Sequence, residues 1–192
     1  MAQSIRAKII MNHGFTLVEL LIVVIILAIL AGIVVPQFAS STDDAKSSAA
    51  DSTLSNLRSS IDLYYQQHGS YPGSSTAVGT SCPGTPAGTP GTGDASDAAN
   101  REDAFLSQMT YYTDVAGKAC STKDTTYKFG PYLKKRPLPS DPFTGNTSAI
   151  EVVTAGNLNM VANTTPTGGP GGYKYDSATG KIIINLLAEQ AR

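Results

Sequence analysis

Hydrophobic positions are distributed unevenly, and the longest apolar run lies near the start of the chain. Residues 15–35 are almost wholly apolar, and Glu19 is the single charged side chain among them. A helix of this length rises about 31 Å, which matches the hydrocarbon core of a bilayer. The run therefore predicts one transmembrane helix. Because the basic residues Arg6 and Lys8 precede it, residues 1–14 should stay in the cytoplasm and the rest of the chain should be exported.

The chain keeps a helical period beyond this run, across residues 36–68. Apolar and aromatic side chains recur there at spacings of three and four, at Leu54, Leu57, Ile61, Tyr64 and His68. Because Gly69 and the turn residues after it end the pattern, one helix is expected from Phe15 to His68. Gly32 and Pro36 weaken this helix near the outer end of the apolar run and predict a kink there.

Residues 69–126 are predicted to form a loop followed by a short helix. The loop, residues 69–93, is rich in Gly, Pro, Ser and Thr, and such a composition buries too little apolar surface to order itself. The helix is expected around Asn100–Tyr112, with Asp97 or Asn100 as its N-cap. Its apolar face would be formed by Phe105, Leu106, Met109 and Tyr112.

Prolines and strand-like runs divide residues 127–192. Four prolines between Tyr127 and Asn146 predict an extended crossing with turns. Two hairpins are expected after it, the first pairing Ile150–Thr154 with Leu158–Ala162, and the second pairing Tyr173–Asp176 with Lys181–Asn185. Together they predict a small antiparallel β-sheet that covers the apolar stripe of the long helix. The chain is therefore expected to be an α+β protein.

Charge and length narrow the classes of function. At 192 residues there is room for one globular domain with an appendage. The net charge is -1, and without residues 1–14 the chain would carry 12 basic and 15 acidic side chains. A nucleic-acid partner would need clustered basic residues, so none is expected. LKKR at Leu133–Arg136 is the one basic cluster, and it is interpreted as a solvated turn.

The two cysteines, Cys82 and Cys120, lie well after the apolar run. Their separation fits neither a zinc site nor a CxxC motif. In an oxidising compartment they would form a disulfide, and the alternative is two free, buried thiols.

The segment from His13 to Phe38, HGFTLVELLIVVIILAILAGIVVPQF, resembles the type IV prepilin signature. Type IV pilins and the pseudopilins of type II secretion share this signature, in which a basic leader ends in Gly and is followed by Phe, TLVE and an apolar helix. The resemblance implies that a prepilin peptidase removes the leader by cutting between Gly14 and Phe15, and then methylates the new amine of Phe15. It also implies the pilin-like lollipop fold, a long N-terminal helix packed on a small antiparallel β-sheet.

Glu19 is the most informative residue of this segment. A carboxylate within a membrane helix is costly and is normally paired or functional. The resemblance implies that Glu19 attracts the N-terminal amine of a neighbouring subunit during assembly. The alternative is a glutamate that reaches the membrane interface, or that is protonated there.

A second stretch, from Tyr127 to Asn146, resembles the PYLK…P…DP(W/F)…G pattern of the major pseudopilin of type II secretion. It favours a pseudopilin, although Phe143 stands where that family usually has tryptophan. The expected function is a structural subunit of the inner membrane that polymerises into a helical filament with an exported C-terminal domain. Its expected partners are copies of itself, other pilins or pseudopilins, the prepilin peptidase, the assembly platform in the inner membrane, and the bilayer before assembly. The alternatives are a type IV pilin of a surface filament and a minor pilin that acts as a ligand-binding tip.

No catalytic residues are expected, since neither histidine has a partner pattern for nucleophilic catalysis. An exported enzyme on a membrane anchor is therefore disfavoured. Calcium is the one cofactor to consider, because major pseudopilins often bind Ca²⁺ near the C terminus. Calcium requires six to eight oxygen ligands. The candidate donors are Asp141, Asn146 and Asp176, but the sequence contains no short acidic cluster and no ligand set is assigned.

Overall fold

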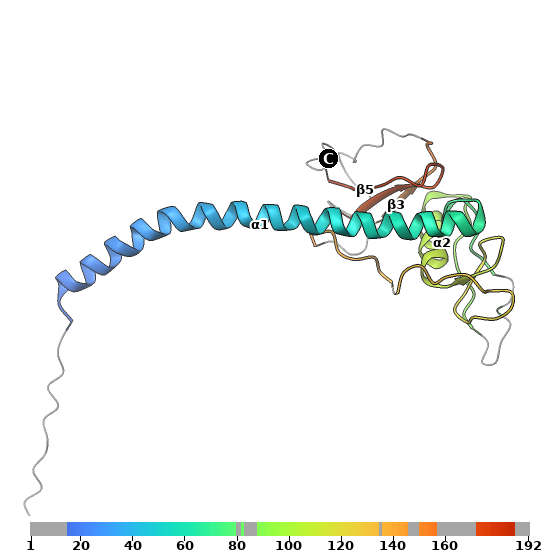
Figure 1. The fold of residues 1–192 in the computed structure, drawn as a ribbon, viewed down its shortest axis with the longest axis horizontal. Helices are drawn as coiled ribbons and strands as arrows, with labels where there is room; N and C mark the ends of the chain where they lie inside the picture. The colour runs from blue at the N-terminus through green and yellow to red at the C-terminus, as the bar shows by residue number, and fades with distance from the viewer. Residues whose placement is uncertain are drawn as a thin grey trace, which may run out of the picture. The chain divides into compact units, whose positions relative to one another are not determined.

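The computed structural model describes residues 15–79, 82, 88–134, 136–145, 150–156 and 172–186. The chain divides into two compact units, Met1–Ala45 and Lys46–Arg192. A single long helix, α1 (Leu17–His68), contributes to both units (Figure 1). The helix ends where the sequence predicted and begins two residues later than predicted. Its backbone is helical through Gly32 and Pro36, so the helix is not interrupted there.

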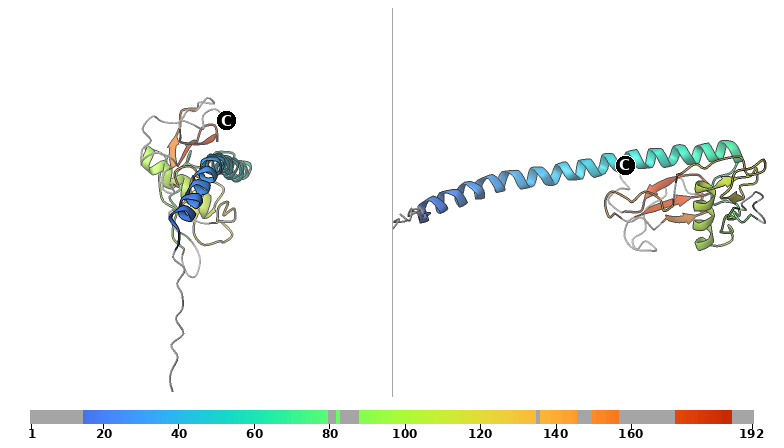
Figure 2. Two further views of the ribbon diagram at one scale, coloured as in Figure 1. Left: turned by 90° about the vertical axis from the view of Figure 1, so that its left-hand side faces the viewer. Right: turned by 90° about the horizontal axis from the view of Figure 1, so that it is seen from below.

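The second half of α1 buries the stripe that the sequence predicted. Leu57, Ile61 and Tyr64 are almost completely buried, and Leu54 and His68 are partly buried. Within the unit Lys46–Arg192, the sheet and the second helix both lie along one side of this part of α1 (Figure 2). The periodicity of three and four residues therefore identified the face that packs.

The main sheet has three strands in the order β3 (Ile150–Val153), β4 (Tyr173–Asp176) and β5 (Ile182–Ile184). Strands β4 and β5 are antiparallel, so the second predicted hairpin and the α+β class are confirmed. In contrast, β3 runs parallel to β4, which corrects the expectation that all pairs are antiparallel. A parallel pair needs a connection of about a dozen residues or more, and the segment between Val153 and Tyr173 is long enough. The predicted partner strand, Leu158–Ala162, lies outside the described residues.

Helix α2 (Ala98–Thr110) begins with the cap that the sequence allowed. The side chain of Asp97 accepts a hydrogen bond from Asn100 N–H at 2.9 Å, which satisfies one of the free N–H groups of the first turn. Phe105 and Met109 are fully buried. The helix ends earlier than predicted, because Tyr111 is extended and Tyr112 begins strand β1.

A short hairpin that the sequence did not predict follows α2. Strand β1 (Tyr112–Thr113) pairs antiparallel with β2 (Ala119–Cys120). The described part of the loop 69–93 pairs with β2: Ala119 N–H donates to Ala77 O at 3.0 Å, and Ser121 N–H donates to Thr89 O at 2.9 Å. The described part of the loop is thus held by hydrogen bonds to another segment, since its own apolar surface is small.

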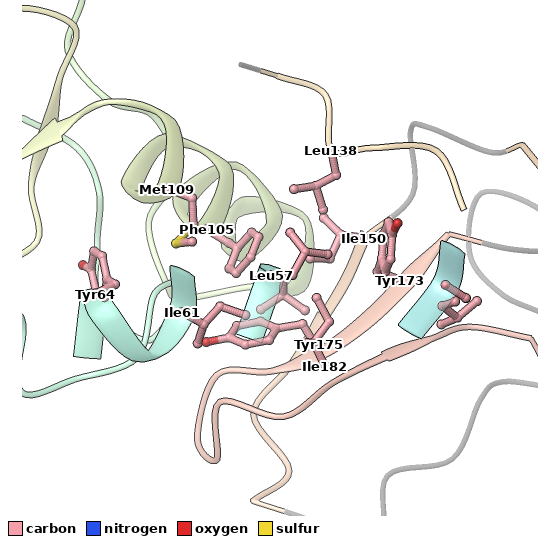
Figure 3. Close-up of a cluster of buried hydrophobic side chains, with 13 residues drawn as sticks. Leu57, Ile61, Tyr64, Phe105, Met109, Leu138, Ile150, Tyr173, Tyr175 and Ile182 are labelled. Carbon is pink, nitrogen blue, oxygen red and sulfur yellow. The ribbon is translucent and has the colours of Figure 1, made fainter. Parts of the chain in front are cut away.

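The core of this unit is built from all of these elements. Figure 3 shows side chains from α1, α2 and the three-stranded sheet pointing toward one another. The Pro-rich crossing adds Leu138, and its Leu133 N–H donates to Met109 O at 2.8 Å. Arg136 forms an ion pair with Asp103 of α2 at 3.1 Å. The LKKR stretch, predicted as a solvated turn, therefore also contacts α2 through Leu133 and Arg136.

Candidate functional site

The start of α1 is organised by Thr16, the residue immediately before the helix. Glu19 N–H donates to Thr16 Oγ1 at 3.2 Å, and Leu20 N–H donates to Thr16 O at 3.2 Å. The Thr16 hydroxyl in turn lies 3.5 Å from Glu19 Oε2. Thr16 is thus the N-cap of α1, and Glu19 occupies the third helical position, which is the spacing of a capping box. The T-x-x-E pattern was the signal for this role, and the sequence interpretation overlooked it.

Beyond Glu19, α1 is apolar on every side as far as Val34. Residues Leu17–Val34 are long and apolar enough to cross a membrane, and none of this stretch is buried by the described residues. Phe15, which precedes the cap, is 68% exposed. A shallow hollow at the helix start is lined by Phe15, Thr16, Leu17, Leu20, Leu21 and Val24. A continuous exposed apolar surface of this kind is typical of a segment that lipid or another protein covers.

The predicted processing and assembly residues gather at this end of the helix. Phe15 and Glu19 lie on either side of the Thr16 cap, whereas Gly14 lies outside the described residues. Apart from the neighbouring backbone of the helix itself, no described atom comes within 4 Å of a Cβ built on Gly32, so packing among the described residues does not require a glycine there. The kink predicted at Gly32 and Pro36 stays a prediction.

The two cysteines are brought together in the second unit. Cys82 and Cys120 form a disulfide with a Cα–Cα distance of 5.6 Å, as predicted. The bridge packs with the largely buried ring of Tyr127. It therefore attaches the loop after α1 to strand β2.

Asp141, one candidate calcium ligand, is fully buried and already surrounded by donors. Its carboxylate accepts hydrogen bonds from the backbone N–H groups of Phe143, Thr144 and Gly172 at 2.9–3.0 Å, and from the Thr144 hydroxyl. Burial alone would raise the pKa of Asp141. The hydrogen bonds together lower this pKa by more than burial raises it, so it lies below the ordinary value.

Asp176, the other calcium candidate among the described residues, has a hydrogen-bond partner of its own. Asp176 is buried and accepts a hydrogen bond from Ala178 N–H at 3.0 Å, and Asn146 lies outside the described residues. In the part of the chain that the structure describes, no group of three or more His, Cys, Asp or Glu side chains could hold a metal ion. Asp141 thus fastens the crossing to the start of β4 through hydrogen bonds.

Comparison with known proteins points to the same end of the chain. The model of the prokaryotic N-terminal methylation motif matches residues 10–35. The chain is 41% identical over 61 residues to the type II secretion system core protein G of Pseudomonas aeruginosa, a match that covers 32% of this chain and 43% of that protein. It is 38% identical over 69 residues to a fimbrial protein of Neisseria meningitidis serogroup B, covering 36% of this chain and 41% of that protein.

A third relative is the type IV major pilin protein PilE1 of Neisseria gonorrhoeae, which is 36% identical over 73 residues. That match covers 38% of this chain and 44% of the relative. The chain thus spans less than half the length of each of these three relatives. No solved structure matches it.

Proposed function

We propose that this prepilin-like chain is a structural subunit, rather than an enzyme, that polymerises with copies of itself into a type IV-like filament. One observation carries the proposal: Leu17–Val34 is apolar, is not buried by the described residues, and carries a single carboxylate, Glu19, in its first turn. Lipid covers such a surface before assembly, and the same helix of neighbouring subunits covers it afterwards.

Processing prepares this helix for release from the inner membrane. A prepilin peptidase cuts between Gly14 and Phe15 and methylates the amine of Phe15, and the match to the N-terminal methylation motif supports this step. A glycine before the scissile bond leaves the backbone open to a protease at the membrane face. The cut also removes Arg6 and Lys8, which would otherwise hold the helix end at the cytoplasmic surface.

Glu19 supplies the specificity of assembly. A carboxylate at the centre of a membrane helix is unfavourable by about 3 kcal/mol on insertion scales, and Glu19, in the first turn of the apolar stretch, bears part of this cost. Pairing with the ammonium group of a neighbouring Phe15 would neutralise both charges as the subunit leaves the lipid. The pairing therefore favours the filament over the dispersed subunits.

The filament we favour is the pseudopilus of a type II secretion system, which drives protein export with an assembly platform in the inner membrane and other pseudopilins. The similarity to core protein G supports this choice, as does the PYLK…DPF…G stretch. A second candidate is a pilin of a surface filament, because the matches to the fimbrial protein and the major pilin are of similar extent.

Mass spectrometry of the intact chain, made with and without a prepilin peptidase, tests the proposal. We expect a mature chain that starts at methylated Phe15 in assembled filaments. Filaments built from chains that still carry Met1 would contradict it. Deletion of the gene in its host then separates the two filaments, because loss of a secreted enzyme indicates a pseudopilus and loss of surface fibres indicates a pilus.

A further inference from the structure

We propose that Thr16 is a positioning residue for Glu19: its hydroxyl group holds the glutamate carboxylate toward the start of α1 until a neighbouring amine takes it. This inference rests on the proposed function, in which Glu19 pairs with that amine. The two residues contact each other reciprocally, since Glu19 N–H donates to Thr16 Oγ1 at 3.2 Å and the Thr16 hydroxyl faces Glu19 Oε2 at 3.5 Å.

The N-terminal end of α1 is a favourable place for an anion. The first N–H groups of a helix have no carbonyl partner within it, and the helix dipole places partial positive charge there. A Glu19 carboxylate turned back toward the Thr16 hydroxyl stays at this end of the helix. A carboxylate turned toward the bilayer centre would lie in hydrocarbon, where a charge is unfavourable.

The direction of the carboxylate also decides whether it can meet its partner. Copies of the chain insert into the membrane in one orientation, so the amine of each processed Phe15 lies at the depth where α1 begins. The Thr16 contact keeps Glu19 at this depth. In a subunit that lacks the contact, the Glu19 carboxylate must first return to this depth. The fraction of subunits ready to pair with a neighbouring amine is therefore lower.

A Thr16 that served only as the N-cap of α1 would need different side-chain chemistry from one that also positions Glu19. An N-cap needs only an acceptor for Glu19 N–H, whereas positioning also needs a donor for the carboxylate. Serine and asparagine can accept and donate, and aspartate can accept but would repel Glu19. Glycine provides neither group, but at an N-cap it weakens a helix only slightly relative to threonine.

The test uses the full chain with its prepilin peptidase and assembly machinery. Tagged variants are co-expressed with excess untagged chain, and the tagged fraction in sheared filaments is divided by the tagged mature chain in the membrane. We expect Thr16→Ser and Thr16→Asn to incorporate within about twofold of the tagged wild-type chain, since both keep the contact. Thr16→Asp and Thr16→Gly should incorporate at least about fivefold less, the factor that corresponds to one lost hydrogen bond.

A double variant shows whether Thr16 acts through Glu19. In a Glu19→Gln background, Thr16→Gly should cause no further drop, because residues that share one interaction are not additive. The inference is overturned if Thr16→Gly and Thr16→Asp incorporate like the wild-type chain, or if Thr16→Gly lowers incorporation equally in both backgrounds. If instead Glu19→Gln alone incorporates normally, the charge pairing of the proposed function is itself wrong.

Discussion

The side-chain oxygen of Gln108 accepts a hydrogen bond from Gly73 N–H at 2.6 Å and so joins helix α2 to the loop that follows α1. The amide nitrogen of the same fully buried side chain donates to Ser75 O at 3.0 Å and to Gly117 O at 2.9 Å. One polar residue thus satisfies three backbone groups from two separate loops. Such a fully satisfied buried amide fixes the position of the segments around it.

Replacing Gln108 with leucine should destabilise the unit Lys46–Arg192 strongly. The change leaves the buried Gly117 carbonyl, the buried Gly73 N–H group and the partly buried Ser75 carbonyl without Gln108, and each buried group left unpaired costs about 1–3 kcal/mol. We expect the free energy of unfolding to fall by at least about 2 kcal/mol. Urea unfolding of the chain in detergent, followed by near-ultraviolet circular dichroism, measures this unit because all 9 tyrosines follow residue 63.

The matched control is Gln66→Leu, because Gln66 is an exposed glutamine on α1. It should change the free energy of unfolding by less than about 0.5 kcal/mol. Equal losses for Gln66→Leu and Gln108→Leu would contradict the role assigned to the buried amide.

Gln108 also illustrates why only part of this fold was predictable. Leu57, Ile61 and Tyr64 repeat with the helical period, so their burial follows from local sequence. The arrangement of the described part of the loop 69–93 does not follow from local sequence, because it depends on hydrogen bonds to α2 and β2, which are distant in the chain. The parallel pairing of β3 with β4 was missed for the same reason, since a hairpin is the local alternative and the true partner is about 20 residues away.

The candidate site was more accessible to sequence reasoning than the fold of the second unit. Phe15 and Glu19 belong to one uninterrupted segment, so their spacing alone places them within one helical turn of the cap. Thr16 was overlooked because its role is a contact with Glu19, although the T-x-x-E spacing of three residues was visible. The disulfide was predicted as a pair because the sequence contains only Cys82 and Cys120.

Asp141 should make the second unit sensitive to acid. Its pKa is below the ordinary value in the folded chain, so the folded state binds fewer protons than the unfolded state. The stabilisation is therefore complete above the unfolded value, near pH 4, and is lost as the pH falls through the folded pKa. We expect Asp141→Asn to lower the free energy of unfolding by about 1–3 kcal/mol at pH 7 and by less in acid.

Unfolding curves between pH 7 and pH 3 measure this difference. Asp51→Asn provides the comparison, because Asp51 is exposed on α1 and its replacement should leave the pH profile unchanged. A difference between Asp141→Asn and the wild-type chain that stays constant down to pH 3 would show that the carboxylate does not contribute through its ionisation.

Loss of the disulfide should release the loop from β2. The bridge joins residues 38 positions apart, and a cross-link over such a loop stabilises the folded state by about 4 kcal/mol in the chain-entropy model. We expect Cys82→Ser to lower the free energy of unfolding by about 2–4 kcal/mol. A reducing agent should have the same effect on the wild-type chain and none on the variant. A variant that still responds to the reducing agent would argue against this bridge.

Gly93 should be difficult to replace, because it combines an unusual backbone angle with a close contact to the backbone of α2. Its φ is +88°, in the region that favours glycine, and a Cβ there would lie 2.3 Å from two backbone atoms of α2, Asn100 O and Ala104 N. Gly145 has a similar φ of +73°, but no described atom beyond its chain neighbours would lie within 4 Å of a Cβ there. The two sites therefore share the cost of the backbone angle and differ in the contact.

Alanine substitution at both positions separates these effects. Gly145→Ala should lower the free energy of unfolding by about 1–2 kcal/mol, the cost of a left-handed residue with a side chain. The free energy of unfolding should fall by about 1–3 kcal/mol more for Gly93→Ala than for Gly145→Ala, because α2 must shift to make room for the methyl group. Near-ultraviolet circular dichroism during urea unfolding gives both values on the same tyrosine signal. Equal losses would mean that α2 yields freely at this contact, and that the backbone angle alone requires the glycine.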